Sequence, residues 1–463
     1  MKKTWKKVLA MLSVLAVMTS SLAACSTAGK QEPGTVSDLQ SAAESTADAA
    51  AADGSVSGGE GEEIVLRFAW WGSETRHEAT LKAIELYEAQ NPNVKIEGEY
   101  QGYDGYYEKM MTMLSSGTAP DLMQFERGWL AEVQGAKHYL ADLSKLPVDT
   151  STLKEGLLSG SCTYNGEPLL FPATVGGRVA FINTEFAGKF GIDITRDYTW
   201  KELMEIGKEV HEKDPESYLM AADIDVINGL FMFSYLTQKT GRTLVDENTY
   251  ELTYNEEQMT EALQTIVDLY ESNTLEPFGE SAVFTGQMEQ NNRWLNGKIG
   301  ILLDTTGACD KYTAAMPDKL DVMMLPSQDD AVCSGVSYGG GIGFVVNDNS
   351  QYKEETAKFL DFLMNDQEAI EALGTCRGYC STDKAEEILS AEGLLNELQI
   401  KAIALSQRNN PYMDNSISSN KELTVIRKDV VQEVIYGDVT PEQGAKEIIE
   451  ESSRILKALK EEQ

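Results

Sequence analysis

The hydrophobic pattern predicts an alternation of strands and helices at the start of the globular part of the chain. Residues 64–71 are rich in β-branched and aromatic side chains and read as a buried strand. Residues 94–100 and 121–125 read as two further strands, and helical periods occupy residues 74–90 and 104–114. This order is typical of a parallel sheet with crossover helices.

Later elements continue the α/β pattern. Helix start signals of the capping-box type occur at Thr199 to Glu202, Asn255 to Gln258 and Thr440 to Gln443. Between them lie three strand candidates, residues 179–182, 299–303 and 343–346. We find no internal repeat of solenoid period. The pattern therefore predicts an α/β protein of two lobes.

Aromatic and charged residues follow the predicted strands of the first segment. In a parallel sheet, ligands bind at the carboxyl ends of the strands, and these ends meet at one edge. We therefore expect a binding site there, formed by Trp70, Trp71, Tyr103, Phe125, Glu126 and Trp129.

The size and charge of the chain narrow the classes of partner. The 463 residues suffice for two packed lobes, and the formal net charge is -35. Such an acidic surface repels nucleic acid and anionic lipid headgroups. It argues only weakly against an anionic ligand, because a local basic pocket can override the overall field.

The N-terminus predicts export and a lipid anchor. Lys2, Lys3, Lys6 and Lys7 precede a short apolar core over residues 8–18, too short to span a bilayer. Leu22-Ala23-Ala24-Cys25 then resembles the lipobox of bacterial lipoproteins, which implies a signal peptide over residues 1–24 and acylation of Cys25. An ordinary secretory signal cleaved near Ala24 is the alternative. We expect a membrane location on the extracytoplasmic face.

The residues after Cys25 predict a tether. Up to about residue 61 the chain is rich in Ala, Ser, Gly, Thr, Asp and Glu and contains no aromatic residue, so it cannot bury enough apolar surface to fold. Residues 25–61 are therefore expected to form the anchor and a disordered linker.

The remaining cysteines and the histidines do not predict a metal site. The odd number of cysteines after Cys25 leaves at least one unpaired within a monomer. Cys376 and Cys380 are close enough for a disulfide or half of a metal site, but the three histidines show no zinc-type spacing. We expect neither metal nor cofactor.

Several segments along the chain together resemble one family. They include residues 68–72 (Phe-Ala-Trp-Trp-Gly), 87–96, 116–122, 166–172, 294–301, 339–344 and 359–363. The chain resembles the extracellular solute-binding proteins, family 1, of sugar ABC importers, the maltose-binding-protein-like group. The cysteines and the segment 376–380 depart from the family pattern.

The resemblance implies a type II two-lobed fold that closes on its ligand by a hinge; periplasmic binding proteins are a standard example of hinge closure. Each lobe would carry a mostly parallel sheet flanked by helices. We assign residues 62–172 and 283–335 to lobe 1 and residues 173–282 and 336–463 to lobe 2, and leave open a return of the C-terminal helices to lobe 1. The first crossing between lobes is expected at residues 166–172.

A sugar site needs aromatic faces for its C–H surfaces and Arg, amide or carboxylate groups for its hydroxyls. In the first lobe we predict Trp70, Trp71, Tyr103, Glu126, Arg127 and Trp129 as ligand contacts. From the crossings and the second lobe we add Arg178, Asn228, Phe231, Asp304, Tyr338 and Gly340. In a strand Trp70 and Trp71 face opposite ways, so one of them belongs to the core.

The resemblance implies a monomeric binding protein that delivers a mono- or oligosaccharide to an ABC permease, with no nucleic-acid partner and no catalytic residues. Two alternatives stay open. An exported glycosidase needs only two carboxylates, which lack a short sequence signature. A sensor that presents bound sugar to a membrane receptor would use the same fold.

Overall fold

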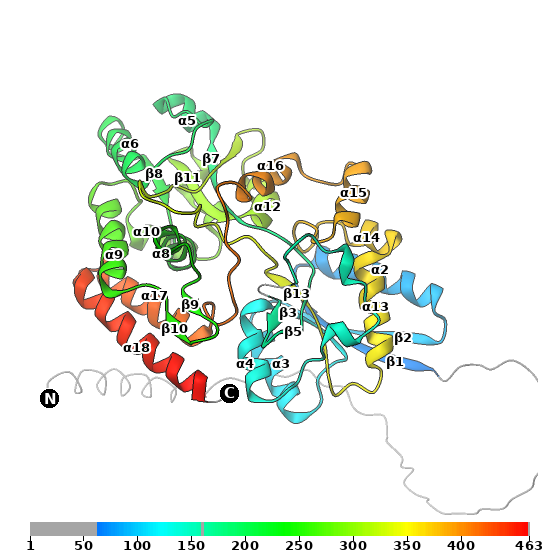
Figure 1. Ribbon diagram of the computed structural model, residues 1–463. Helices are drawn as coiled ribbons and strands as arrows, with labels where there is room; N and C mark the ends of the chain where they lie inside the picture. The colour runs from blue at the N-terminus through cyan, green and yellow to red at the C-terminus, as the bar shows by residue number, and fades with distance from the viewer. Residues whose placement is uncertain (1–62, 159–161, 462–463) are drawn as a thin grey trace, which may run out of the picture. The chain divides into compact units, whose positions relative to one another are not determined.

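The computed structural model describes residues 63–158 and 162–461 (Figure 1). The predicted signal peptide, Cys25 and the tether therefore lie outside the described residues. Within the described residues, no helix is both long and apolar enough to span a membrane.

The first lobe contains a mixed five-stranded sheet with the order β2-β1-β3-β13-β6. Its strands are β1 (Ile64–Trp71), β2 (Val94–Gln101), β3 (Leu122–Glu126), β6 (Phe171–Pro172) and β13 (Ile342–Val346). β1 runs parallel to β2 and β3, as predicted, whereas β13 is antiparallel to both β3 and β6. The expected mostly parallel sheet is thus parallel only in its N-terminal half.

Helices cover both faces of this sheet. They are α2 (Glu74–Gln90), α3 (Tyr106–Ser116), α4 (Leu130–Ala136), α13 (Lys353–Asn365), α14 (Gln367–Leu373) and α15 (Asp383–Ala391). Phe68 and Trp70 of β1 pack in one core with α2 and α13, and Ala69 and Trp71 pack in another with α3 and α4. Because both faces are covered, β1 reads as a continuous hydrophobic run.

The second lobe contains a four-stranded mixed sheet with the order β12-β7-β11-β8. Its strands are β7 (Arg178–Asn183), β8 (Tyr218–Ala221), β11 (Ile299–Thr305) and β12 (Leu320–Met323). β7 is antiparallel to β11 and β12, and β11 is parallel to β8. Two short hairpins, β4 (Thr163–Tyr164) with β5 (Glu167–Pro168) and β9 (Val245–Asp246) with β10 (Glu251–Leu252), stand apart from the two sheets.

The strand pairing corrects the predicted division of the chain. β11 and β12 lie in residues 283–335, which were assigned to lobe 1, yet they pair with β7 and β8 of the second lobe. β13 lies in residues 336–463, assigned to lobe 2, yet it pairs with β3. A hydrophobic run predicts a strand, but its partner is decided by contacts far away in the sequence.

The helices of the second lobe are α5 (Thr184–Phe190), α6 (Trp200–Lys213), α7 (Ile224–Val226), α8 (Phe233–Thr240), α9 (Glu256–Glu271), α10 (Phe278–Ser281), α11 (Asn292–Leu295), α12 (Cys309–Ala315), α16 (Glu397–Ser406), α17 (Lys421–Ile435) and α18 (Pro441–Glu461). The three predicted capping boxes are present at the starts of α6, α9 and α18. α17 and α18 lie beside α9 (Figure 1). The C-terminal helices therefore divide, with α13 to α15 on the first lobe and α16 to α18 on the second.

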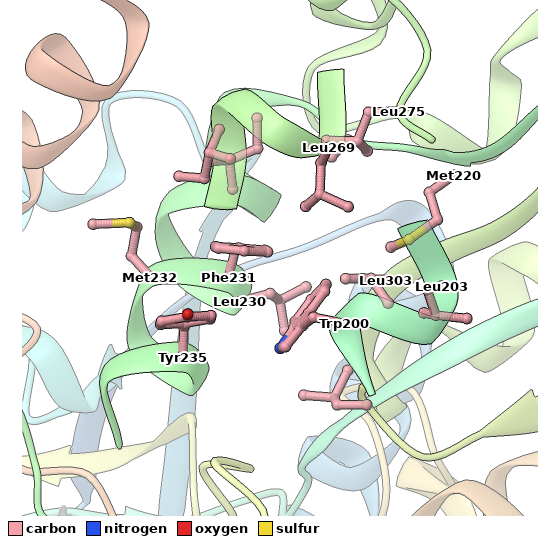
Figure 2. Close-up of a cluster of buried hydrophobic side chains, with 14 of the residues drawn as sticks. Trp200, Leu203, Met220, Leu230, Phe231, Met232, Tyr235, Leu269, Leu275 and Leu303 are labelled. Carbon is pink, nitrogen blue, oxygen red and sulfur yellow. The ribbon is translucent and has the colours of Figure 1, made fainter. Parts of the chain in front are cut away.

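The core of the second lobe is rich in aromatic residues. Figure 2 shows Trp200 of α6, Phe231 and Tyr235 in one cluster with aliphatic side chains from β8, α9 and β11. The ring centroids of Trp200 and Phe231 are 4.4 Å apart, and those of Phe231 and Tyr235 are 5.5 Å apart in a stacked arrangement. This packing gives the second lobe a hydrophobic core of its own.

Two of the segments that cross between the lobes, residues 173–177 and 335–341, lie side by side, and the chain crosses again between α15 and α16. Gly176 and Gly339 exchange two backbone hydrogen bonds of 3.1 and 2.9 Å. The segment after α16 joins them, because the Tyr338 N–H donates to the Tyr412 carbonyl at 2.9 Å. Residues 166–172, expected to form the first crossing, instead hold β5 and β6, and the crossing follows directly.

Candidate ligand-binding cleft

Two adjoining cavities lie between the lobes. The larger has a volume of about 710 Å³ and the smaller about 250 Å³. Arg127, Gly341 and Ile342 line both cavities. The two cavities therefore meet at the end of β3, where it passes the second crossing segment.

The larger cavity has an aromatic wall on the first lobe. Tyr103, Tyr107 and Trp129 line it, and Trp71 supports Trp129 from behind at a centroid distance of 5.4 Å. Tyr103 is 52% exposed, so much of its ring is free to meet a ligand. Flat aromatic faces of this kind complement the apolar C–H faces of a sugar ring.

The opposite wall of the larger cavity comes from helix α17. Lys421, Thr424, Val425 and Lys428 of this helix line it. Lys421 forms an ion pair with Glu108 at 3.2 Å, which links α17 to the first lobe across the cavity. A ligand in this space would touch both lobes.

Glu126 ends strand β3 at the floor of the larger cavity. Burial raises the pKa of its carboxyl group, while a hydrogen bond from Tyr103 and the charge of Arg127 act in the opposite direction. Burial and the Glu126 carboxylate in turn raise the pKa of Tyr103, so its hydroxyl remains a donor at neutral pH. The pair can offer a sugar hydroxyl both a donor and an acceptor.

The smaller cavity is lined by the crossing segments and by three arginines, Arg127, Arg178 and Arg377. Polar groups of Thr305, Thr306 and Ser337 complete its wall. The Arg127 Nη2 donates to Ser337 Oγ at 3.3 Å and lies 3.6 Å from Asp414 Oδ2. Burial lowers the pKa of Arg178 and of Arg377.

Five of the predicted contact residues line these cavities: Tyr103, Glu126, Arg127, Trp129 and Arg178. Trp71 supports the aromatic wall from the core without lining either cavity. The structure therefore brings the residues that follow β3 together with Tyr103 from the loop after β2, and their contact with a ligand stays a prediction.

Three predicted contacts lie in the interior of a lobe. Trp70 is fully buried, and its Nε1 donates to His77 Nδ1 at 3.0 Å on the other face of the first sheet. Asn228 accepts a hydrogen bond of 3.3 Å from Arg427, and Phe231 packs in the core of Figure 2. Both are buried because the helical turn that carries them lies within the second lobe.

The other three lie near the cavities but do not line them. Tyr338 points away because its neighbours Ser337 and Gly339 line the smaller cavity in an extended segment, and its hydroxyl accepts from Gln407 at 2.6 Å. Asp304 is engaged by Tyr312 at 3.2 Å and by Lys311 at 3.1 Å. At Gly340 a Cβ would lie 2.6 Å from the Cβ of Pro172, so this glycine permits the close approach of the Pro172 ring.

Sequence reasoning missed Arg377 and helix α17. Arg377 lies in the segment between Cys376 and Cys380 that departs from the family pattern, and this departure was the one available signal. Nothing local in the sequence of α17 indicates which of its faces meets the first lobe. Cys309, Cys333, Cys376 and Cys380 are free thiols, and the described residues contain no group of side chains suited to hold a metal ion.

The family model for the bacterial extracellular solute-binding proteins matches residues 71–370. Because the match covers more than half of the chain, the protein belongs to this family. The fold is that of the type II periplasmic solute-binding proteins, as the solved structures below show.

One relative and two solved structures show which proteins the chain is similar to. The arabinooligosaccharide-binding protein of Halalkalibacterium halodurans is 25% identical over 62% of this chain and 64% of its own length, so the match spans less than two thirds of that relative. The oligogalacturonide-binding protein of Yersinia enterocolitica, solved with saturated digalacturonic acid, is 25% identical with a TM-score of 0.75, covering 86% of this chain and 100% of that one. A de novo designed esterase is 24% identical with a TM-score of 0.76, covering 86% and 99%, and shows the fold alone.

Proposed function

We propose that the protein captures a saccharide between its two lobes, outside the cytoplasm, and delivers it to an ABC permease. The main support is the cavity of about 710 Å³ with an aromatic wall from one lobe and α17 from the other. The named relatives bind oligosaccharides, which fits this geometry. Hinge closure would turn the binding energy into a shape that the permease recognises.

A thermal-shift screen against mono- and oligosaccharides tests the proposal. A ligand that binds the folded state alone raises the unfolding midpoint by mass action. We expect at least one oligosaccharide to raise the midpoint in a concentration-dependent way. If no saccharide in a broad panel does so, the protein is not a saccharide receptor.

We further propose that binding occurs without turnover. The rival function is a two-carboxylate glycosidase, and Glu126 and Glu132 do line the larger cavity together. In a binding protein these carboxylates serve as hydrogen-bond acceptors. Incubation with the ligand found in the screen, followed by chromatography, should return it unchanged. Steady product formation at substoichiometric protein would establish the glycosidase instead.

We also propose that Cys25 carries the lipid anchor, followed by a disordered tether and preceded by a signal peptide that is removed. The lipobox-like run Leu22 to Cys25 supports this. In bacteria expressing Cys25→Ala, the protein should move from the membrane fraction to the aqueous fraction in detergent phase separation. Cys376→Ala is the matched cysteine control and should remain with the membrane. Retention of Cys25→Ala in the membrane would refute the anchor.

A further inference from the structure

The smaller cavity holds more positive charge than its surroundings neutralise. Asp414 is buried, and its carboxylate lies within 3.6 Å of Arg127. The same carboxylate is also an electrostatic neighbour of Arg178 and of the buried Arg427. Glu126, which lines the larger cavity, acts on Arg127 as well. Asp414 and Glu126 are thus the acids beside Arg127, Arg178 and Arg427, and Arg377 adds a further positive charge to the wall of the smaller cavity, in a protein whose formal net charge is -35.

A third nearby acid, Asp304, does not restore the balance. The charge of Asp304 acts on Arg178, but more weakly than the charge of Asp414 does. The Asp304 carboxylate already forms an ion pair with Lys311 at 3.1 Å and accepts a hydrogen bond from Tyr312 at 3.2 Å. A buried cation without a counter-ion is costly in free energy, so such groups are normally paired. The excess of cations at this cavity therefore calls for an anion from outside the chain.

The three arginines that line the cavity differ in how many of their donors are occupied. Arg377 donates to Gln124 Oε1 at 2.9 Å and to Thr80 Oγ1 at 2.8 Å, and its guanidinium lies over the ring of Phe344. It contributes charge but is held in place by the first lobe.

Arg178 is the opposite case. Its Nη1 is buried and has no hydrogen-bond partner, although its side chain lines the cavity. Its guanidinium is supported by the ring of Phe233, 5.8 Å away. A buried donor left without an acceptor is costly in free energy, and the cost is higher when the group is charged. Arg178 thus has an unused donor at the wall of a cavity of about 250 Å³.

We propose that the smaller cavity binds the carboxylate of an acidic saccharide, with Arg178 and Arg127 as its ligands from the two lobes. A planar carboxylate matches the guanidinium fork and accepts two parallel hydrogen bonds. Arg127 lines both cavities, so a sugar ring that is attached to this carboxylate can extend toward Trp129 in the larger one. This inference rests on the proposed function and specifies its ligand class as uronate-containing oligosaccharides.

Isothermal titration calorimetry of the purified full chain tests the inference with four probes. They are digalacturonate, its neutral methyl ester, a neutral arabino-oligosaccharide of the same length, and galactose 1-phosphate. We expect digalacturonate to bind at least about tenfold more tightly than the methyl ester, because only the free acid can pair with both arginines. Tighter binding of galactose 1-phosphate than of digalacturonate would show an anion site that does not select carboxylates, and would overturn the assignment.

Substitution of Arg178 locates the site. Arg178→Gln should weaken digalacturonate binding by about tenfold or more, and this loss should be at least about threefold larger than the loss of affinity for a neutral saccharide. Arg178→Lys, which keeps the charge but loses the fork, should give an intermediate loss and serves if the Gln variant does not fold. Arg454→Gln, an exposed arginine on α18, is the matched control and should bind digalacturonate like the parent chain.

The outcomes separate the two proposals. If neutral saccharides bind as tightly as digalacturonate, or if both Arg178 variants bind digalacturonate like the parent chain, the acidic-ligand inference is wrong and saccharide capture still stands. If none of the saccharides binds, saccharide capture itself is wrong, and the acidic-ligand inference is lost with it.

Discussion

Individual aromatic residues of the larger cavity have distinct roles. Trp71 is buried against Trp129, whereas Tyr103 lines the cavity and is about half exposed. Tyr103 also contacts the ring of Trp71, with centroids 5.7 Å apart. The aromatic wall is therefore a supported surface of fixed orientation, which lowers the entropy cost of stacking a ligand on it.

Tyr103→Ala should weaken saccharide binding by about tenfold, because it removes a stacking face and the hydroxyl beside Glu126. Titration calorimetry with the ligand found in the screen measures the loss. Tyr352→Ala is the control, since Tyr352 is also an exposed tyrosine but lines neither cavity. Equal affinity of Tyr103→Ala and the parent chain would place the ligand away from this wall.

Trp70 and Trp71 show which part of a side chain's orientation the sequence predicts and which part it does not. Strand alternation predicts that Trp70 and Trp71 face opposite sides, and they do. Which side meets the cavity depends on the helices that cover each face, and those helices come from distant segments such as α13. The same limit explains Tyr338, which was predicted to contact the ligand but which the alternation along its extended segment turns away from the smaller cavity.

At the scale of the elements, the second crossing segment can pack closely against the second lobe because it begins with a glycine. Gly335 has a φ of +67°, and a Cβ there would lie 2.4 Å from the carbonyl oxygen of Ser234 in α8. Both the backbone conformation and the contact exclude a side chain. The start of the second crossing is thereby pressed directly against the helices of the second lobe.

Gly335→Ala should lower the free energy of unfolding by about 2 kcal/mol or more, from strain plus the clash. Gly286→Ala is the matched control, because Gly286 has a φ of +75° but no atom within 4 Å of an added Cβ. Urea unfolding of the two variants should show a clearly smaller loss for Gly286→Ala. Equal losses would mean that the contact with Ser234 relaxes without cost.

Asp214, at the end of α6, ties three elements of the second lobe together. Its carboxylate pairs with Lys189 of α5 at 2.8 Å and with Lys298, just before β11, at 3.0 Å. These pairs, with a hydrogen bond from Ser217, lower the pKa of Asp214. Because the folded-state pKa is depressed, the stabilisation is present above the unfolded-state pKa of about 4 and is lost as the pH falls below it.

Asp214→Asn should therefore be less stable than the parent chain at pH 7, and the difference should shrink toward about pH 3. Urea unfolding at the two pH values measures it. Asp310→Asn is a suitable control, because Asp310 accepts one hydrogen bond from Asn396 and forms none of the ion pairs found among the described residues. A difference for Asp214→Asn that is independent of pH would contradict this account.

Elements were easier to predict from the sequence than their partners. The sequence pattern located α2 and the three strands β1 to β3 because each has a strong local period and clear end signals. It did not place β11 and β13 in their correct sheets, because a strand of five to seven residues carries no local record of its neighbour. Two residues that line the smaller cavity were missed for the same reason: Thr306, directly after β11, and Ser337, in the segment before β13.

At the scale of the whole molecule, both lobes contribute to the proposed site. Arg127 and Trp129 come from the first, and Arg178 and α17 from the second. A ligand that contacts both sides is bound more tightly by the closed arrangement than by the open one, and it shifts the population accordingly. Closure and affinity are thus coupled through the same contacts.

Small-angle scattering should consequently show a smaller radius of gyration when the saccharide found in the screen is added. The Tyr103→Ala variant should show the same compaction, but at a higher ligand concentration, because it loses affinity while retaining both lobes. An unchanged radius at saturating ligand, with binding confirmed by calorimetry, would mean that the lobes do not move on binding.

The position of β13 between β3 and β6 affects the order in which the chain can fold. The four strands of the second sheet, β7, β8, β11 and β12, all lie before residue 324, whereas the first sheet needs β13 at residues 342–346. Joining distant strands costs chain entropy before the contacts repay it, so such pairings form late. During synthesis from the N- to the C-terminus, the first sheet therefore begins to form first but is completed last. The edge of β3 that pairs with β13 stays unpaired until residues 342–346 have been synthesised.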